Sequence, residues 1–64
     1  MNLIFFRDVE ENYIAVNPQY ITFIETDTYC EKEVTMIYFT NYKMAVTESF
    51  ENVVSALNAW RAKS

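Results

Sequence analysis

Carboxylates are the side chains of this chain that most readily suggest chemistry, and they gather in two clusters. The clusters are Asp8, Glu10 and Glu11, and Glu25, Asp27, Glu31 and Glu33. Carboxylate oxygens bind hard cations, but neither cluster has the residue spacing of a calcium-binding loop. We favour solvated loops that keep an apolar protein in solution, and the alternative is a surface that imitates nucleic-acid phosphates. The carboxylates that we predict to lie in partner-facing loops are Asp8, Glu10, Glu11, Asp27 and Glu31.

The residue types that most enzymes use are missing. The chain has no histidine and no glycine, which excludes an imidazole base, a metal–histidine set and a glycine-rich phosphate loop. Cys30 is the one cysteine, so it has no disulfide partner in the chain, and Lys32 would only modestly favour its thiolate. We therefore expect no enzymatic activity, no metal and no cofactor.

Aromatic residues indicate contact surfaces. The chain has five tyrosines, five phenylalanines and one tryptophan, and 52% of it is hydrophobic. Tyrosine combines a large ring with a polar tip, which suits the rim of a protein interface. Ordinary packing within the sheet is the alternative role. The residues that we predict to lie in an oligomer or partner interface are Tyr20, Met36, Tyr38 and Tyr42.

The strands that must position these residues are apolar on both faces. Side chains alternate across a strand, so Ile21 and Phe23 are expected on one face and Tyr20 and Ile24 on the other. Residues 34–39 show the same two-sided pattern. A two-layer domain needs only one apolar sheet face. The second face is therefore expected to meet another copy of the chain or a partner protein.

The pattern predicts an α+β fold in a single domain over residues 1–64, with a small antiparallel β-sheet of four to five strands and one C-terminal helix. Apolar residues from Phe50 to Trp60 recur at helical spacing, and Ser49 is a suitable N-cap. The polar residues 26–33 are expected to form a loop, and residues 41–42 a tight turn. We predict strands at about 3–7, 13–16, 20–25, 34–40 and 43–47, and a helix at about 50–62.

The size and charge of the chain limit its partners. A chain of 64 residues has little stability to spare, because ordering costs roughly 1.5 kcal/mol per residue. We therefore expect a homodimer or higher homo-oligomer. The net charge of −4 and the five scattered basic residues exclude nucleic acid as an ordinary partner. Membrane insertion is not expected, because no apolar run approaches ~20 residues. A free thiol without a recognisable targeting segment predicts a cytoplasmic protein.

Several short segments resemble the small flagellar FlbD family. Residues 16–18 (Val-Asn-Pro), followed by Ile21 and by residues 24–25 (Ile-Glu), are similar to a Leu-Asn-Pro segment of that family. Residues 34–41 resemble its threonine- and isoleucine-rich strand, and residues 46–49 its entry into a C-terminal helix. The family's hairpin glycines are absent. The resemblance implies a small cytoplasmic β-sheet protein with a terminal helix that acts through protein contacts and has no catalytic residues.

The leading functional hypothesis is a non-enzymatic, oligomeric protein-interaction or regulatory module of the FlbD-like type, with a larger protein as its partner. The alternative is an inhibitor, encoded by a phage or mobile element, that binds a host defence or transcription protein or holds a small ligand between subunits. A pull-down from the protein's own cells distinguishes them, because an adaptor retains one abundant partner and an inhibitor retains a defence or transcription enzyme.

Overall fold

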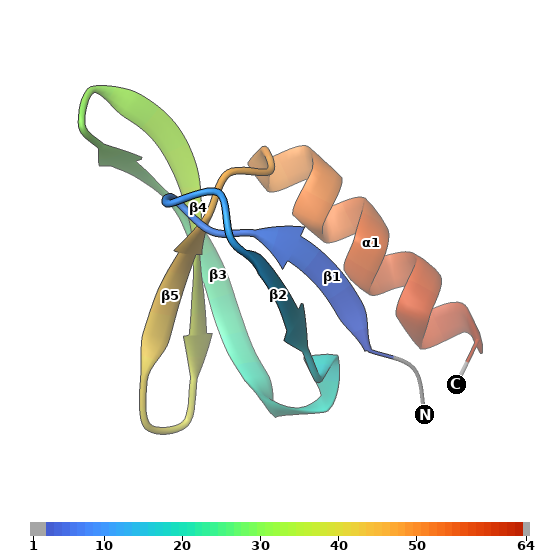
Figure 1. Ribbon diagram of the computed structural model, residues 1–64. Helices are drawn as coiled ribbons and strands as arrows, with labels where there is room; N and C mark the ends of the chain where they lie inside the picture. The colour runs from blue at the N-terminus through green and yellow to red at the C-terminus, as the bar shows by residue number, and fades with distance from the viewer. Residues whose placement is uncertain (1–2, 64) are drawn as a thin grey trace.

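Five strands and one long helix make up the molecule in a computed structural model that describes residues 3–63 (Figure 1). The elements are β1 (Ile4–Arg7), β2 (Tyr13–Val16), the 3₁₀ helix η1 (Pro18–Tyr20), β3 (Ile21–Tyr29), β4 (Lys32–Phe39), β5 (Lys43–Val46) and α1 (Phe50–Lys63). All strand pairs are antiparallel. The predicted α+β arrangement with a C-terminal helix is confirmed.

The strands form two sheets, so the prediction of one sheet with four to five strands is wrong. One sheet is the hairpin β1–β2, and the other has the order β3–β4–β5. The reason lies at the end of β2, where Asn17 caps η1 by accepting a hydrogen bond from the backbone nitrogen of Gln19 at 3.1 Å. Pro18 begins η1 and has no N–H for a ladder. The 3₁₀ turn thus redirects the chain before β3 begins.

Among residues 3–63, hydrogen bonds join the hairpin β1–β2 to the larger sheet at a junction where β1 ends. Asp8 forms an isolated antiparallel bridge with Val46, at the end of β5. The backbone nitrogen of Thr47 donates to the carbonyl oxygen of Arg7 at 2.9 Å, and the Thr47 hydroxyl donates to the same oxygen at 3.3 Å. The hairpin is therefore hydrogen-bonded to β5 where β1 ends.

Residues 26–33 form the distal half of a long hairpin, and the prediction of a loop there is wrong. β3 and β4 stay in register as far as the pair Tyr29–Lys32, and Figure 1 shows this hairpin extending past the rest of the molecule. Cys30 and Glu31 make the turn, with φ values of 50° and 65°. Positive φ at both central residues matches the twist of two-residue hairpins. The segment is polar because its strands extend into solvent.

The hairpin between β4 and β5 turns one residue earlier than predicted. The chain bends at Thr40 and Asn41, whereas Tyr42 follows the bend. The carbonyl oxygen of Tyr42 accepts a hydrogen bond from the backbone nitrogen of Phe39 at 2.7 Å, and the two rings stack 4.7 Å apart. Asn41 is not among the residues with positive φ. Ring stacking, rather than a left-handed asparagine, accompanies this turn.

The core lies where α1 and the hairpin β1–β2 meet the larger sheet. Its buried residues are Phe6, Val16, Ile37, Val46 and Val53. Helix α1 begins as predicted, because the Ser49 hydroxyl accepts a hydrogen bond from the backbone nitrogen of Asn52 at 3.1 Å.

Thr35 joins the central strand to the start of the helix. It is fully buried, and its hydroxyl donates to the carbonyl oxygen of Glu48 at 2.7 Å. An unpaired buried hydroxyl would cost about 1–3 kcal/mol, so this bond ties Thr35 to the segment that leads into α1.

Candidate interaction surfaces

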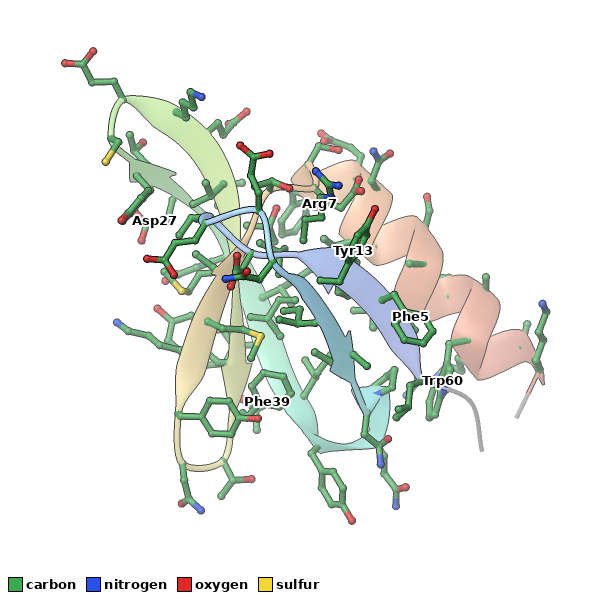
Figure 2. The ribbon with its side chains drawn as sticks, in the orientation of Figure 1. Phe5, Arg7, Tyr13, Asp27, Phe39 and Trp60 are labelled. Carbon is green, nitrogen blue, oxygen red and sulfur yellow. The ribbon has the colours of Figure 1, made fainter. Side chains whose placement is uncertain are left out.

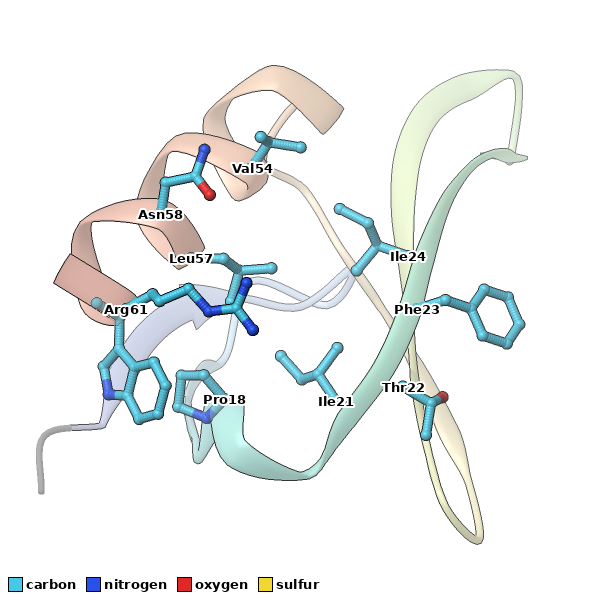
Figure 3. Close-up of a pocket in the computed structure, with 10 residues that line it drawn as sticks. Pro18, Ile21, Thr22, Phe23, Ile24, Val54, Leu57, Asn58 and Arg61 are labelled. Atoms are coloured by element: carbon cyan, nitrogen blue, oxygen red, sulfur yellow. The ribbon is translucent and has the colours of Figure 1, made fainter. Parts of the chain in front are cut away.

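The face of β3–β4–β5 that points away from α1 is the first candidate surface, and we call it the outer sheet face. Figure 3 shows Ile21 and Ile24 directed toward the helix and Phe23 directed away from it. Phe23 pairs with Tyr38, and Tyr38 pairs with Lys43. Paired residues share a face and alternate along a strand. The outer sheet face is therefore made by Phe23, Glu25, Met36, Tyr38, Lys43 and Ala45.

A β-bulge determines which side chains of β3 reach this face. The register shifts between Ile21 and Phe23, so Ile21 and Ile24 share the core side while Phe23 lies on the other. The prediction that Ile21 and Phe23 share one face is therefore wrong. The hydroxyl of the intervening Thr22 donates to the carbonyl oxygen of Tyr38 at 3.1 Å. This bulge removes Phe23 from the core and exposes 54% of it.

An aromatic pair forms the centre of the outer sheet face. The rings of Phe23 and Tyr38 stack with centroids 4.1 Å apart and planes inclined by 13°. The Tyr38 hydroxyl donates to Oε1 of Glu25 at 2.5 Å, and Nζ of Lys43 lies 5.6 Å from the Tyr38 ring centroid. The hydrogen bond to Glu25 is the main cause that raises the pKa of Tyr38 above its ordinary value, with burial and nearby carboxylate charge adding to it. Tyr38 therefore stays a neutral donor.

Opposite charges flank this aromatic centre. Glu25 is on β3 and Lys43 is on β5, and β4 lies between them. Adjacent strands lie ≈ 4.8 Å apart, so the two charges are separated by about two strand spacings. The surface thus has an acidic side, an apolar middle and a basic side.

A groove between η1 and the β4–β5 hairpin is the second candidate surface, and we call it the tyrosine groove. It has a volume of about 400 Å³. The residues that line it include Asn17, Tyr20, Phe39, Asn41, Tyr42 and Met44. Tyr20 and Tyr42 are 60% and 58% exposed. Phe39 pairs with Ile21, which places the groove on the core side of the sheet, opposite the outer sheet face.

The four predicted interface residues fall on these two separate surfaces. Tyr20 and Tyr42 line the tyrosine groove, whereas Met36 and Tyr38 are half-buried on the outer sheet face. The sequence prediction did not include Phe23 among the interface residues, because a simple alternation rule places it on the same face as Ile21. Thr22, the residue at the bulge, gave no signal, because threonine is common in regular strands as well.

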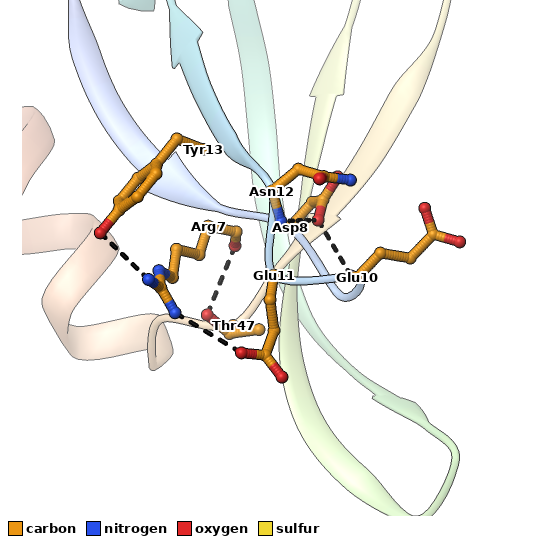
Figure 4. Close-up of polar contacts among 7 residues, drawn as sticks. All are labelled: Arg7, Asp8, Glu10, Glu11, Asn12, Tyr13 and Thr47. Carbon is orange, nitrogen blue, oxygen red and sulfur yellow. Dashed lines mark hydrogen bonds and ion pairs between the residues drawn. The ribbon is translucent and has the colours of Figure 1, made fainter.

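The carboxylate of Asp8 stabilises the turn between β1 and β2. Its Oδ1 accepts hydrogen bonds from the backbone nitrogens of Glu10 and Asn12, both at 2.9 Å (Figure 4). The Asn12 amide also donates to Oδ2 at 3.5 Å. These bonds, with that from the Asn12 backbone as the largest contribution, lower the pKa of Asp8. The carboxylate of Asp8 is therefore engaged in hydrogen bonds within its own turn.

Arg7 organises the other side of this turn. Its guanidinium donates to the Tyr13 hydroxyl at 3.1 Å, lies 4.6 Å from that ring's centroid and pairs with Glu11 at 3.6 Å. The hydrogen bond to Tyr13 is the largest cause that raises the pKa of Arg7. Glu11 adopts φ 66°, so it forms the left-handed position of the turn as well as the ion pair. Glu10 is exposed (Figure 4).

The remaining acidic candidates lie on the distal hairpin. Asp27 is exposed there, and its Oδ1 accepts a hydrogen bond from the backbone nitrogen of Thr28 at 2.7 Å. Glu31 is exposed at the tip next to Cys30. Figure 2 shows Asp27 well separated from the exposed rings of Phe5 and Tyr13. Within residues 3–63, no group of three or more acidic or cysteine side chains is arranged to hold a metal ion.

Comparisons with family models, curated proteins and solved structures return no match. None of the helices in the described part of the chain has the length and apolar character needed to cross a membrane. The two surfaces above are therefore the basis for a functional proposal.

Proposed function

We propose that this chain is a small, non-enzymatic protein-interaction module of the FlbD-like type that dimerises through its outer sheet face and binds a larger cytoplasmic protein. The observation that carries the proposal is the Phe23–Tyr38 stack on the outer sheet face, where Phe23 is 54% exposed and directed away from α1. Large exposed aromatic rings that adjoin other apolar side chains are typical of protein interfaces. Met36 and Ala45 extend the apolar surface beside the stack.

A second copy of the chain is the occupant that the charges favour. A symmetric dimer uses the same patch on both subunits, so the patch must be complementary to itself. With a two-fold axis parallel to the strands, β3 of one copy lies over β5 of the other. Glu25 then faces the side of the partner copy that carries Lys43, and the pairing occurs twice. Two sheets stacked this way lie ≈ 10 Å apart, which long side chains can span.

The energetics of burial agree with a reversible dimer. Full burial of a phenylalanine contributes about 1.5–3 kcal/mol, and Phe23 is already partly covered. Each Phe23 therefore adds on the order of 1 kcal/mol on association. A standard interface buries about 800 Å² per partner, which is about one sixth of the 4735 Å² surface of this chain. An interface of that size extends from the aromatic pair along β4 and β5.

The test compares two phenylalanines of different surfaces. Phe23→Ser removes the centre of the outer sheet face, and Phe5→Ser removes a ring that is 70% exposed on β1. Light scattering after size exclusion should show a dimer for the wild type and for Phe5→Ser, and a monomer for Phe23→Ser. A wild-type chain that stays monomeric at about 100 μM, or a Phe23→Ser variant that stays dimeric, would contradict the proposal.

A further inference from the structure

We infer that the tyrosine groove binds an extended, proline-rich segment of the partner protein. The inference rests on the proposed function, because it names the chemistry of the larger partner of the module. It concerns the opposite side of the sheet from the outer sheet face, so dimerisation leaves the groove open. Three properties of the groove lead to this ligand: its charge, its hydrogen-bonding groups and its rings.

The groove is electrically neutral in a chain rich in charge. Charged residues make up 22% of the sequence, yet the residues that line the groove include none. A groove without a lysine or an arginine has no charged partner for a phosphate or a carboxylate, and one without an acid has none for an ammonium group. The neutral lining therefore favours an uncharged ligand over a nucleotide, an acidic peptide or a basic peptide.

The polar groups of the groove can supply several hydrogen-bond donors. Asn17 already uses Oδ1 to accept a bond from Gln19, so its amide nitrogen is the part left to act on a ligand. The hydroxyls of Tyr20 and Tyr42 add two more donors. These donors can bind a ligand that offers only acceptors. Proline-rich chains do so, because proline has no N–H and the polyproline II helix leaves its carbonyl groups without internal partners.

The ring of Tyr42 and the backbone that carries Tyr20 are held in place before a ligand arrives. Tyr42 is stacked on Phe39 with planes inclined by 13°. Tyr20 belongs to η1, where its backbone nitrogen donates to the carbonyl oxygen of Asn17 at 3.1 Å. Flat aromatic rings in fixed positions accept pyrrolidine rings, and the polyproline II helix is itself ordered before binding. Little conformational entropy is lost when two ordered partners meet.

The probe is a labelled ten-residue proline peptide, with a glycine–serine peptide of equal length as the control. The wild-type chain should bind the proline peptide saturably at about 1 mM or tighter, with shifts of the Met44 methyl and of the Tyr20 and Tyr42 ring signals in NMR spectra. Tyr42→Ala should weaken binding about tenfold, and Tyr42→Phe, which keeps the ring, should weaken it less. Tyr20→Ala tests the other wall without altering the β4–β5 hairpin.

The outcomes separate this inference from the proposed dimer. Phe23→Ser should bind the peptide as the wild type does, even though it is monomeric. The inference is overturned if the peptide causes no saturable shifts, if the glycine–serine peptide binds equally, or if the shifts appear at Phe23 and Tyr38. Preferential binding of a neutral oligosaccharide, which can also stack on tyrosine rings, would overturn it too. None of these results would alter the dimer measured for the wild type.

Discussion

The carboxylates of this chain differ in what each one does, although they look alike in the sequence. Asp8 stabilises a turn by accepting two hydrogen bonds from backbone nitrogens. Glu25 accepts a hydrogen bond from the Tyr38 hydroxyl on the outer sheet face. Glu11 pairs with Arg7, whereas Glu31 lies exposed at a hairpin tip. An acidic surface for a partner would therefore have to be built from residues that the chain does not already use.

The stability of the β1–β2 turn should depend on the charge of Asp8. Its folded-state pKa lies below the ordinary value of ~3.9, so its stabilisation is fully present above that pH and is lost as the pH falls through the lowered pKa. Asp8→Asn keeps an acceptor oxygen but removes the charge. Urea unfolding at several pH values below about 4 should show a weaker pH dependence for this variant. Glu10→Gln is the control, and an unchanged slope in Asp8→Asn would contradict the assignment.

At the scale of the elements, three turn residues adopt conformations that usually belong to glycine. Glu11, Cys30 and Glu31 have φ values of 66°, 50° and 65°. A left-handed conformation costs a residue with a Cβ roughly 1–2 kcal/mol. The chain contains no glycine to avoid this cost. The strain at the distal hairpin is balanced by the eight residue pairs that join β3 and β4.

Glu31→Gly should stabilise the long hairpin. Glycine removes the Cβ clash at φ 65°, and part of this gain is offset by the greater freedom of glycine in the unfolded chain. We expect a net increase of about 0.5–1 kcal/mol in the free energy of unfolding, measured with urea. Glu33→Gly removes the same charge at a regular strand position, where glycine should destabilise by a similar amount. Destabilisation by both changes would show that residue 31 carries no strain.

Local signals explain which elements could be predicted from the sequence. Helix α1 was predictable because its apolar spacing and the Ser49 cap depend on residues close together in the chain. The division of the strands into two sheets could not be predicted, since strand pairing depends on where η1 redirects the chain. The hairpin over residues 26–33 was missed because solvated strands lack an apolar face. Alternation predicted that Met36 and Tyr38 share one face of β4, and it failed for Phe23 because of the bulge.

At the scale of the whole molecule, the two surfaces lie on opposite sides of one three-stranded sheet. The outer sheet face carries Glu25 and Lys43 on opposite strands around an aromatic centre. The tyrosine groove lies on the core side, beside η1. A dimer joined through the first surface would present two copies of the second, facing away from each other. Two linked sites bind a repeated segment more tightly than one site does.

The charge arrangement of the dimer predicts a specific pattern of association. Glu25→Lys alone places like charges opposite each other in a homodimer, and Lys43→Glu alone does the same with acids. Each variant should dimerise about tenfold or more weakly than the wild type, because facing like charges are costly. A mixture of the two should form a heterodimer, since both cross-subunit pairs then have opposite charges. Native mass spectrometry measures all three species.

The mixture also controls for effects within one subunit. Glu25→Lys removes the hydrogen bond from Tyr38 in its own chain, and mixing does not restore that bond. Recovery on mixing therefore reports the contact between subunits. Glu33→Lys, an exposed position on the distal hairpin, should leave the homodimer unchanged. Dimers that form equally well in every combination would show that β3 does not lie over the partner's β5.

The junction between Asp8 and Val46 determines how the molecule comes apart locally. The backbone of the β1–β2 hairpin is bonded to β5 at this end, and toward the other end Ile4 and Val16 are held by packing. Opening of the hairpin away from the larger sheet must therefore break both the junction at Asp8 and the packing of Val16. An opened hairpin exposes Phe6 and Val16, which the same hairpin from a second copy could cover. Strand exchange between subunits is thus the route to aggregation that this architecture leaves open.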